Sequence, residues 1–282
     1  IAEAFPVLRR LPWEGRWYAV SLDQAYQLFI ALNLLLLGVE TSLAHVSNGT
    51  LLPGEWVPMV FGPIAATLVV IGHFARIRRR RWASPLLAFV LILSIVVGVA
   101  GTYLHLDRSM RLTAPAGMRF GLRQLVWGLP LLAPPSFALI GVLGLVTLTD
   151  LDTQTKRRAY MLLTSLGILI AAVSSTIDHL RTGFENPWLW IPVITGIFGT
   201  IAALTAGSLK DLHRGDIIIY TLTMIVLVLV GPMGLVLHLL YDLGPGRSLI
   251  VERLLRQAPI LAPMVFANFG LMGPIAVLGE NE

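Results

Sequence analysis

Four histidines, each preceded by two small residues at a fixed spacing, are the side chains of this sequence best suited to chemistry. The pattern reads small, two residues, small, three residues, His, and it ends at His45, His105, His179 and His238. On a helix this spacing places the small residues and the His on one face, in successive turns. A neutral imidazole at the end of an apolar helix is suited to bind haem or another tetrapyrrole as an axial ligand, or to bind copper or zinc.

Two of the four copies have glycine at both small positions, which leaves the most room beside the imidazoles of His105 and His238. These glycines are Gly98, Gly101, Gly231 and Gly234. A flat macrocycle could lie against such a face, and we predict that His105 and His238 form a ligand pair across a central axis. The alternative is that the small residues let two helices pack closely and that each His binds a loop carbonyl. Recurrence does not decide between them, because duplication copies a structural feature as faithfully as a ligand.

Acidic residues near the histidines are candidates for metal ligands or for partners that orient the imidazoles. The predicted metal-binding set is His105, His238, Asp107, Asp178, Asp242 and Glu40. Glu40 shares one helical stripe with Tyr26 and Asn33. An acidic residue near the centre of a membrane costs roughly 2.5 to 3.5 kcal/mol on insertion scales, so Glu40 should face protein, water or a cation.

The composition requires a membrane protein to position these residues. Of 282 residues, 56% are hydrophobic and 13% are charged, with a mean hydropathy of +0.77. A helix needs about 20 apolar residues to cross the hydrocarbon core. Eight stretches of about this length are predicted to span the membrane: 22–46, 56–75, 83–105, 126–149, 159–180, 188–208, 216–240 and 258–279.

The spans alternate in a way that indicates four tandem repeats. Each His-bearing run is followed by a loop and then by an apolar run with proline near its start, at Pro58, Pro134, Pro192 and Pro263. We therefore predict an all-α, polytopic protein of four helix-loop-helix units arranged as two parallel halves. Residues 1–21 form an interfacial segment, residues 22–150 the first half and residues 151–282 the second half.

The charges of the connections predict the orientation. The segments between repeats are mostly basic, as in RIRRRRW from Arg76, and basic loops favour the cytoplasmic side. We expect a multi-pass plasma membrane protein with both termini in the cytoplasm and the four motif histidines at the outer face. His73 and His213 then lie at the cytoplasmic ends, too far away to join them. Residues 111–130 and 247–262 are expected to lie along the interface and to contact other membrane subunits.

The remaining features narrow the function classes. The chain has no cysteine, which excludes disulfides, thiolate metal ligands and iron-sulfur clusters held by this chain. No hydrolase triad, nucleotide loop or HExxH motif is present, so an enzyme is not expected, and the net charge of +5 fits membrane flanks rather than nucleic-acid binding. We expect a non-catalytic subunit of an electron-transfer or photosynthetic complex that binds haem, pigment, quinone or metal. The alternatives are a transporter or metal-handling protein using Glu40 and the histidines, and a membrane scaffold.

Overall fold

The computed structural model describes most of the helical part of the chain. Described are residues 21–47, 51–113, 132–244 and 259–278, with the single positions 121, 126, 127, 246, 250 and 253. These residues form helices and turns without any strand. The predicted all-α, polytopic fold is confirmed. The segments expected along the interface, residues 1–21, 111–130 and 247–262, lie mostly outside the described residues.

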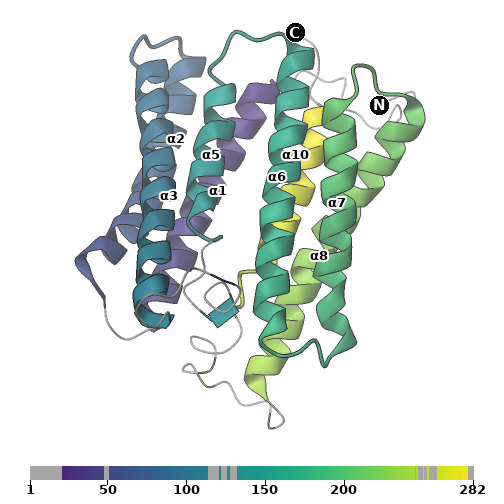
Figure 1. The fold of residues 1–282 in the computed structure, drawn as a ribbon. Coiled ribbons are helices and arrows are strands. Elements are labelled where there is room, and N and C mark those ends of the chain that lie inside the picture. The colour runs from purple at the N-terminus through teal and green to yellow at the C-terminus, as the bar shows by residue number, and fades with distance from the viewer. Residues whose placement is uncertain are drawn as a thin grey trace.

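Eight α-helices of the described chain form the bundle in Figure 1. They are α1 (Leu22–Ser47), α2 (Trp56–Ile77), α3 (Ala83–Thr113), α5 (Pro135–Val146), α6 (Thr153–Leu180), α7 (Trp190–Ser208), α8 (Arg214–Leu243) and α10 (Met264–Leu278). Short 3-10 turns, Pro53–Glu55 and Pro187–Leu189, lead into α2 and α7. Each α-helix falls within or close to one of the eight predicted spans.

Six of the eight helices are long and apolar enough to cross a membrane: α1, α2, α3, α6, α7 and α8. The other two, α5 with 12 residues and α10 with 15 residues, are shorter than the predicted spans 126–149 and 258–279. The reason lies in the prolines. Pro135 is the first residue of α5, and Pro263 immediately precedes α10. Each helix begins at or directly after a proline, which lacks the backbone N–H that an interior helical position must donate, and not at the start of the apolar run.

Two helix starts show how polar side chains set the boundaries. Asp152 caps α6, because its carboxylate accepts hydrogen bonds from Thr155 N at 2.9 Å and Thr155 Oγ1 at 2.6 Å. These bonds hold the pKa of Asp152 below its usual value. At the start of α8, the backbone N of His213 donates to the Asp216 carboxylate at 2.9 Å. Both caps satisfy amide groups that the first turn leaves without helical partners.

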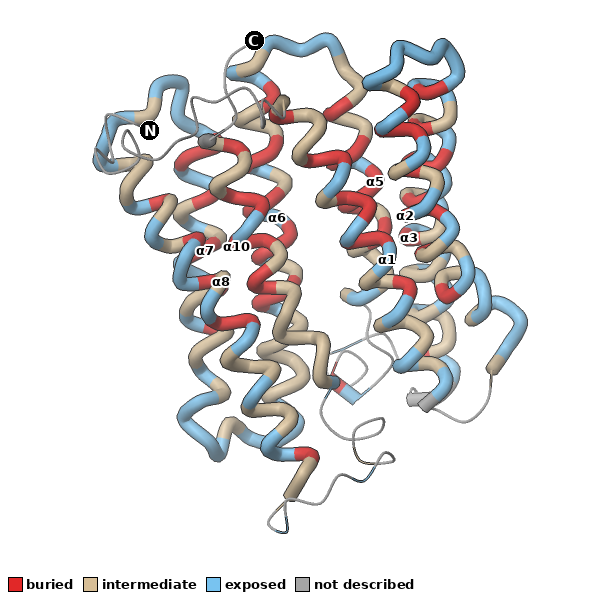
Figure 2. The backbone as a smooth tube through the Cα atoms, turned by 180° about the vertical axis from the view of Figure 1, so that it is seen from behind, coloured by how far each residue is buried: buried red, intermediate tan, exposed pale blue. Residues whose placement is uncertain are grey.

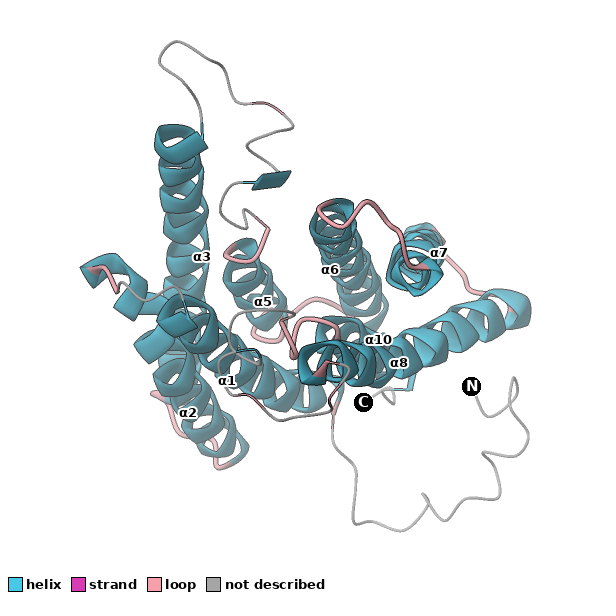
Figure 3. Cartoon of the chain, turned by 90° about the horizontal axis from the view of Figure 1, so that it is seen from below, coloured by secondary structure: helices cyan, strands magenta, loops and turns pink. Residues whose placement is uncertain are grey.

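The helices pack as four hairpins, which are the predicted helix-loop-helix units: α1 with α2, α3 with α5, α6 with α7, and α8 with α10. Within the halves, α2 also packs on α3 and α7 on α8. Contacts between the halves run through α1 with α10 and through α5 with α6. Seen from below, α1, α5, α6 and α10 therefore form the centre of the bundle, with the other helices outside them (Figure 3). The division of the chain near residue 150 remains a prediction.

Direct backbone contact holds each hairpin together. A Cβ atom added to Gly62 of α2 would lie 2.6 Å from Cα of Gly38 in α1, and one added to Gly98 of α3 would lie 2.4 Å from the backbone N of Ala138 in α5. The second half repeats these contacts with Gly196 against Ala172, and with Gly231 against Ala267. In a bilayer, helix association depends on such close packing. Lipid tails are as apolar as the helix side chains, so the hydrophobic effect does not draw the helices together.

Two stacked tyrosines join the halves. Tyr26 of α1 and Tyr160 of α6 are separated by the same offset as His45 and His179, and their rings stack with centroids 3.8 Å apart and planes inclined by 13°. Their hydroxyls are engaged as well, because Tyr26 Oη donates to Met272 O of α10 at 2.9 Å. The buried residues concentrate where the central helices meet (Figure 2).

The outward surfaces of the bundle are strongly apolar. Phe89 of α3, Phe198 of α7 and Leu229 of α8 each expose more than three-fifths of their surface, at 63%, 65% and 64%. On a soluble protein, a belt of such residues would be costly and prone to aggregation. Together with the six long apolar helices, this belt indicates contact with a lipid bilayer.

Replacing a packing glycine should weaken the hairpin directly. We expect Gly98→Ala to lower the free energy of unfolding by about 1 to 3 kcal/mol, because the new Cβ meets a backbone atom that cannot rotate away. Thermal unfolding in detergent measures the effect. Gly215→Ala in α8 is the matched control, since no atom lies within 4 Å of its added Cβ. Equal stability of the two variants would contradict the proposed role of backbone contact.

Candidate functional site

The structure brings the motif histidines together as two pairs, one in each half. His45 of α1 and His105 of α3 have ring centroids 6.2 Å apart and ring planes inclined by 69°. His179 of α6 lies close enough to His238 of α8 for their charges to interact. All four stand in the C-terminal parts of their helices. The candidate site is therefore a pair of imidazoles from two helices that belong to different hairpins.

Hydrogen bonds to backbone oxygens fix the tautomer of three of the four imidazoles. The Nδ1 atoms of His45, His179 and His238 lie 2.9, 3.0 and 2.9 Å from the backbone oxygens of Thr41, Leu189 and Pro259, respectively. A carbonyl oxygen only accepts, so Nδ1 carries the hydrogen in each ring. In the neutral imidazole, Nε2 then keeps its lone pair. Metal-binding histidines are commonly oriented by such a bond, although the same bond also fits a purely structural role.

The expected pairing of His105 with His238 across a central axis is wrong. These residues belong to α3 and α8, which are not among the helices that pack against one another. Each helix instead packs within its own half, α3 against α2 and α5, and α8 against α7 and α10. The central helices carry His45 and His179, so the partner of each outer histidine comes from a central helix of the same half.

The glycine faces beside the histidines are covered by protein. Cβ atoms added to Gly101 and Gly234 would lie 3.0 and 2.5 Å from the Cβ atoms of Pro134 and Pro263. Gly98 and Gly231, one turn earlier, meet the second helix of the same hairpin at 2.4 and 2.5 Å. These faces leave no space for a macrocycle, and the structure favours close packing as the reason for all four glycines.

An open apolar groove lies along the contact between α3 and α5. It has a volume of about 330 Å³ and runs between α3 and α5. Its lining residues are Val99, Thr102, Tyr103, Leu106, Pro135 and Ala138. Thr102 and Leu106 are neighbours of His105 in the sequence of α3, although neither histidine of the first pair lines the groove.

The aspartates proposed as metal ligands have other partners. Asp107 forms an ion pair with Arg111 at 2.9 Å, and Asp178 lies 3.9 Å from Arg181. Asp178 is also near enough to His179 and His238 to interact with their charges, whereas Asp242 is buried. Among the described residues, no group of three or more His, Asp or Glu side chains is placed to hold a metal ion.

The three residues of the predicted polar stripe on α1 lie in different environments. Tyr26 is fully buried, and Asn33 is buried with its Nδ2 donating to Phe29 O at 2.9 Å. Glu40 is half-buried and makes no hydrogen bond or ion pair within the part of the chain that the structure describes. The structure thus does not join Glu40 to a metal-binding group.

A buried polar cluster at the opposite end of the bundle was missed by sequence reasoning. His73 Nδ1 of α2 donates to Gln27 Oε1 of α1 at 3.0 Å, and Gln27 Nε2 donates to Thr147 Oγ1 at 3.1 Å. Arg76 Nη1 donates to Thr147 O at 2.8 Å. The sequence places His73 at the other end of its span, too far away to join the motif histidines, but does not predict its partners. The available signal was that Gln27 and Thr147 are polar residues of apolar spans at the same membrane level as His73.

An ion pair extends this polar region across the interface between the halves. Lys156 Nζ of α6 lies 2.5 Å from Asp23 Oδ2 of α1, and Tyr160 Oη donates to Asp23 Oδ1 at 2.9 Å. Both charged side chains are mostly covered, with 11% and 21% of their surface exposed. Nearby, the hydroxyl of Tyr220 is buried without a hydrogen-bond partner among the described residues. The arrangement provides charge pairing and orientation, but no nucleophile with an adjacent base.

Replacing one partner of this ion pair should destabilise the protein more than replacing both partners. We expect Asp23→Asn to lower stability by about 3 kcal/mol, because it leaves the Lys156 charge covered and unpaired. The double variant Asp23→Asn with Lys156→Met should recover part of that loss. A double-mutant cycle followed by thermal unfolding measures the coupling. A double variant no more stable than Asp23→Asn alone would show that the two charges do not interact.

Comparisons with known proteins add no family assignment. No protein-family model, no curated protein and no solved structure matches the chain. The functional argument therefore rests on the geometry of the histidine pairs and on the polar clusters of this chain itself.

Proposed function

We propose that the chain is a non-catalytic, membrane-embedded subunit of an electron-transfer complex, in which His45 and His105 bind a transition-metal centre. The observation that carries the proposal is the approach of these two imidazoles from separate hairpins, with ring centroids 6.2 Å apart. Imidazole nitrogens are suitable ligands for copper, zinc, nickel and iron, including haem iron.

The ring separation is compatible with one ion held between the two imidazoles. A metal-nitrogen bond is about 2 Å long, and the ring centroid lies roughly 1 Å beyond the nitrogen. Two imidazoles on opposite sides of an ion therefore have centroids about 6 Å apart. The bond from His45 Nδ1 to Thr41 O leaves Nε2 as the coordinating atom. The remaining ligands would come from a macrocycle, from solvent or from another subunit.

The surroundings of the pair favour a redox role over hydrolytic chemistry. The groove of about 330 Å³ between α3 and α5 is apolar, and low polarity around a metal centre tunes its reduction potential. Haem, pigment or quinone could place an apolar part there, whereas the covered face of Gly98 and Gly101 could not receive it. If the complex is photosynthetic, His45 and His105 would be the ligands of its pigment or metal in the same way. Other subunits of the complex, and the outer location of the pair, belong to the proposal.

One observation favours a second candidate, the membrane scaffold. The glycines are fully accounted for by helix packing, and carbonyl hydrogen bonds account for the Nδ1 atoms of three histidines. A scaffold needs nothing more from these residues. The two candidates differ in whether His45 and His105 bind a metal.

Metal loading of the purified protein tests the proposal. We expect wild-type protein in detergent to bind about one equivalent of copper or haem, detected by visible absorption and elemental analysis. His45→Ala and His105→Ala should each reduce this binding at least tenfold, because each removes one of two ligands. Thermal unfolding in detergent verifies that the variants remain folded.

Two further variants serve as controls. His213→Ala should bind like the wild type, because the exposed His213 side chain lies at the start of α8, distant from both pairs. His238→Ala should also retain binding to the first pair, since its ring bonds Pro259 O in the other half. A wild type that stays colourless and metal-free after loading, or equal loss in all variants, would leave the scaffold as the better explanation.

A further inference from the structure

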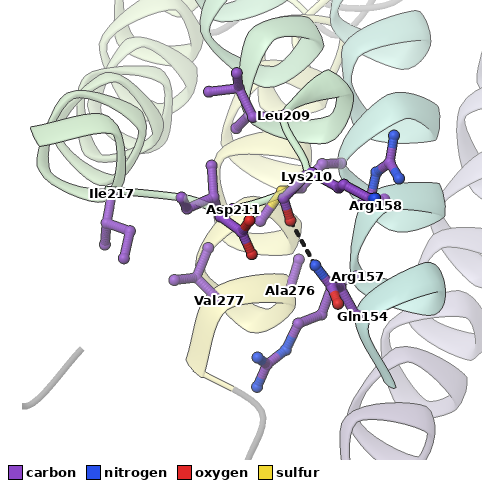
Figure 4. A pocket seen from close by; sticks show the side chains of 12 residues that line it. Gln154, Arg157, Arg158, Leu209, Lys210, Asp211, Ile217, Ala276 and Val277 are labelled. Atoms are coloured by element: carbon purple, nitrogen blue, oxygen red, sulfur yellow. Dashed lines mark hydrogen bonds between the residues drawn. The ribbon is translucent and has the colours of Figure 1, made fainter. Parts of the chain in front are cut away.

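A cavity of about 440 Å³ opens in the second half, at the end of the bundle opposite the histidine pairs. Side chains from α6, α10 and the connection between α7 and α8 surround it (Figure 4). Its size lies within the range of small-molecule sites, roughly 300 to 1,000 Å³. The apolar part of its wall comes from Met161, Ala206, Leu209, Leu212, Ala276 and Val277.

Apolar residues line this cavity where the first half has its polar cluster. The offset from His45 to His179 also relates Gln27 to Met161, and the offset from Pro134 to Pro263 relates Thr147 to Ala276. In the first half, Gln27 and Thr147 fill the corresponding space and bind one another at 3.1 Å. The second half thus lacks the hydrogen-bonded pair that these two positions form in the first half.

The charge of the cavity also differs between the halves. The same offset relates Asp23 to Arg157, so an acidic residue in the first half corresponds to a basic one in the second. Lys210 corresponds to Arg76, whose guanidinium is engaged by Thr147 O. The Lys210 ammonium is exposed and makes no hydrogen bond within the described residues, although its backbone oxygen accepts from Gln154 Nε2 (Figure 4).

The remaining charged residues leave the cavity positive. Arg158 lines it while bonding the backbone oxygens of Gly207 and Ser208 at 3.1 and 3.2 Å, which holds the end of α7 in place. Asp211 contributes one carboxylate at the rim. Three basic residues and one acidic residue therefore line the cavity, and this charge balance favours an anion.

The position of the cavity identifies the source of that anion. α6 begins and α7 ends beside it, and both helices are long enough to span the bilayer. The opening consequently lies at the level of lipid headgroups, with an apolar wall below basic side chains. Basic pockets between transmembrane helices are known to suit anionic headgroups. We infer that this cavity binds the phosphate group of an anionic phospholipid, with Arg157 and Lys210 as its cationic contacts.

Lipid titration of the intact protein in detergent tests the inference. Short-chain phosphatidylglycerol should raise the unfolding temperature of the wild type and bind stoichiometrically by native mass spectrometry, whereas phosphatidylcholine should bind at least tenfold more weakly. Arg157→Gln and Lys210→Gln should each weaken phosphatidylglycerol binding at least fivefold. Arg80→Gln, which removes an exposed charge from the α2–α3 connection, is the matched control and should bind like the wild type.

Two further arms make the result decisive. Met161→Gln with Ala276→Thr transfers the filled arrangement of the first half, and it should reduce phosphatidylglycerol binding without lowering stability in lipid-free detergent. Inorganic phosphate alone should give no comparable stabilisation. Stabilisation by inorganic phosphate equal to that by the lipid would identify a soluble anion as the ligand and overturn the lipid assignment. Equal loss of binding in Arg80→Gln, or no preference over phosphatidylcholine, would overturn the site itself.

Discussion

Contact between bare helix backbones is the constraint on which the rest of this structure depends. Inside a bilayer the hydrophobic effect does not bring helices together, so their association relies on close packing and on a few polar contacts. At Gly62 against Gly38, and at Gly98 against Ala138, the two helices of a hairpin approach without an intervening side chain. This approach holds the first helix of each hairpin against the second, and the histidines near the ends of the first helices are positioned as a result. A pair such as His45 and His105 joins two hairpins, which meet where α2 packs on α3.

The two halves share a frame but use it differently. In the first half, Gln27, His73 and Thr147 fill the space at one end with a connected polar cluster. In the second half, Met161 and Ala276 occupy corresponding positions and a cavity remains. A buried polar cluster favours one packing arrangement when every member is hydrogen-bonded. The packing at this end of the bundle is therefore more strongly determined in the first half than in the second. The helix contacts are therefore alike in the two halves, while the side chains between the helices differ.

Sequence reasoning predicted the parts of this protein that repeat. The His spacing and the prolines that follow located eight helices and their pairing into hairpins, because both depend on local periodicity. It did not predict which histidines meet, since the arrangement of hairpins depends on contacts between distant segments such as Tyr26 and Tyr160. The shared offset of those tyrosines was visible in the sequence, but an offset alone does not reveal contact. The lengths of α5 and α10 were overestimated because apolar composition continues past the prolines at which these helices begin.

The ion pair between Asp23 and Lys156 also bears on how such a protein can be assembled. In a dimer of identical chains, a contact across the two-fold axis presents the same patch from both sides. The residue of the first half that corresponds to Lys156 is Leu22, and the residue of the second half that corresponds to Asp23 is Arg157. Two copies of the first half would therefore bring Asp23 against a leucine, and two copies of the second would bring Lys156 against an arginine. The charges therefore favour contact between the two different halves over contact between two copies of the same half. In this respect the halves of the chain resemble the two different subunits of a heterodimer.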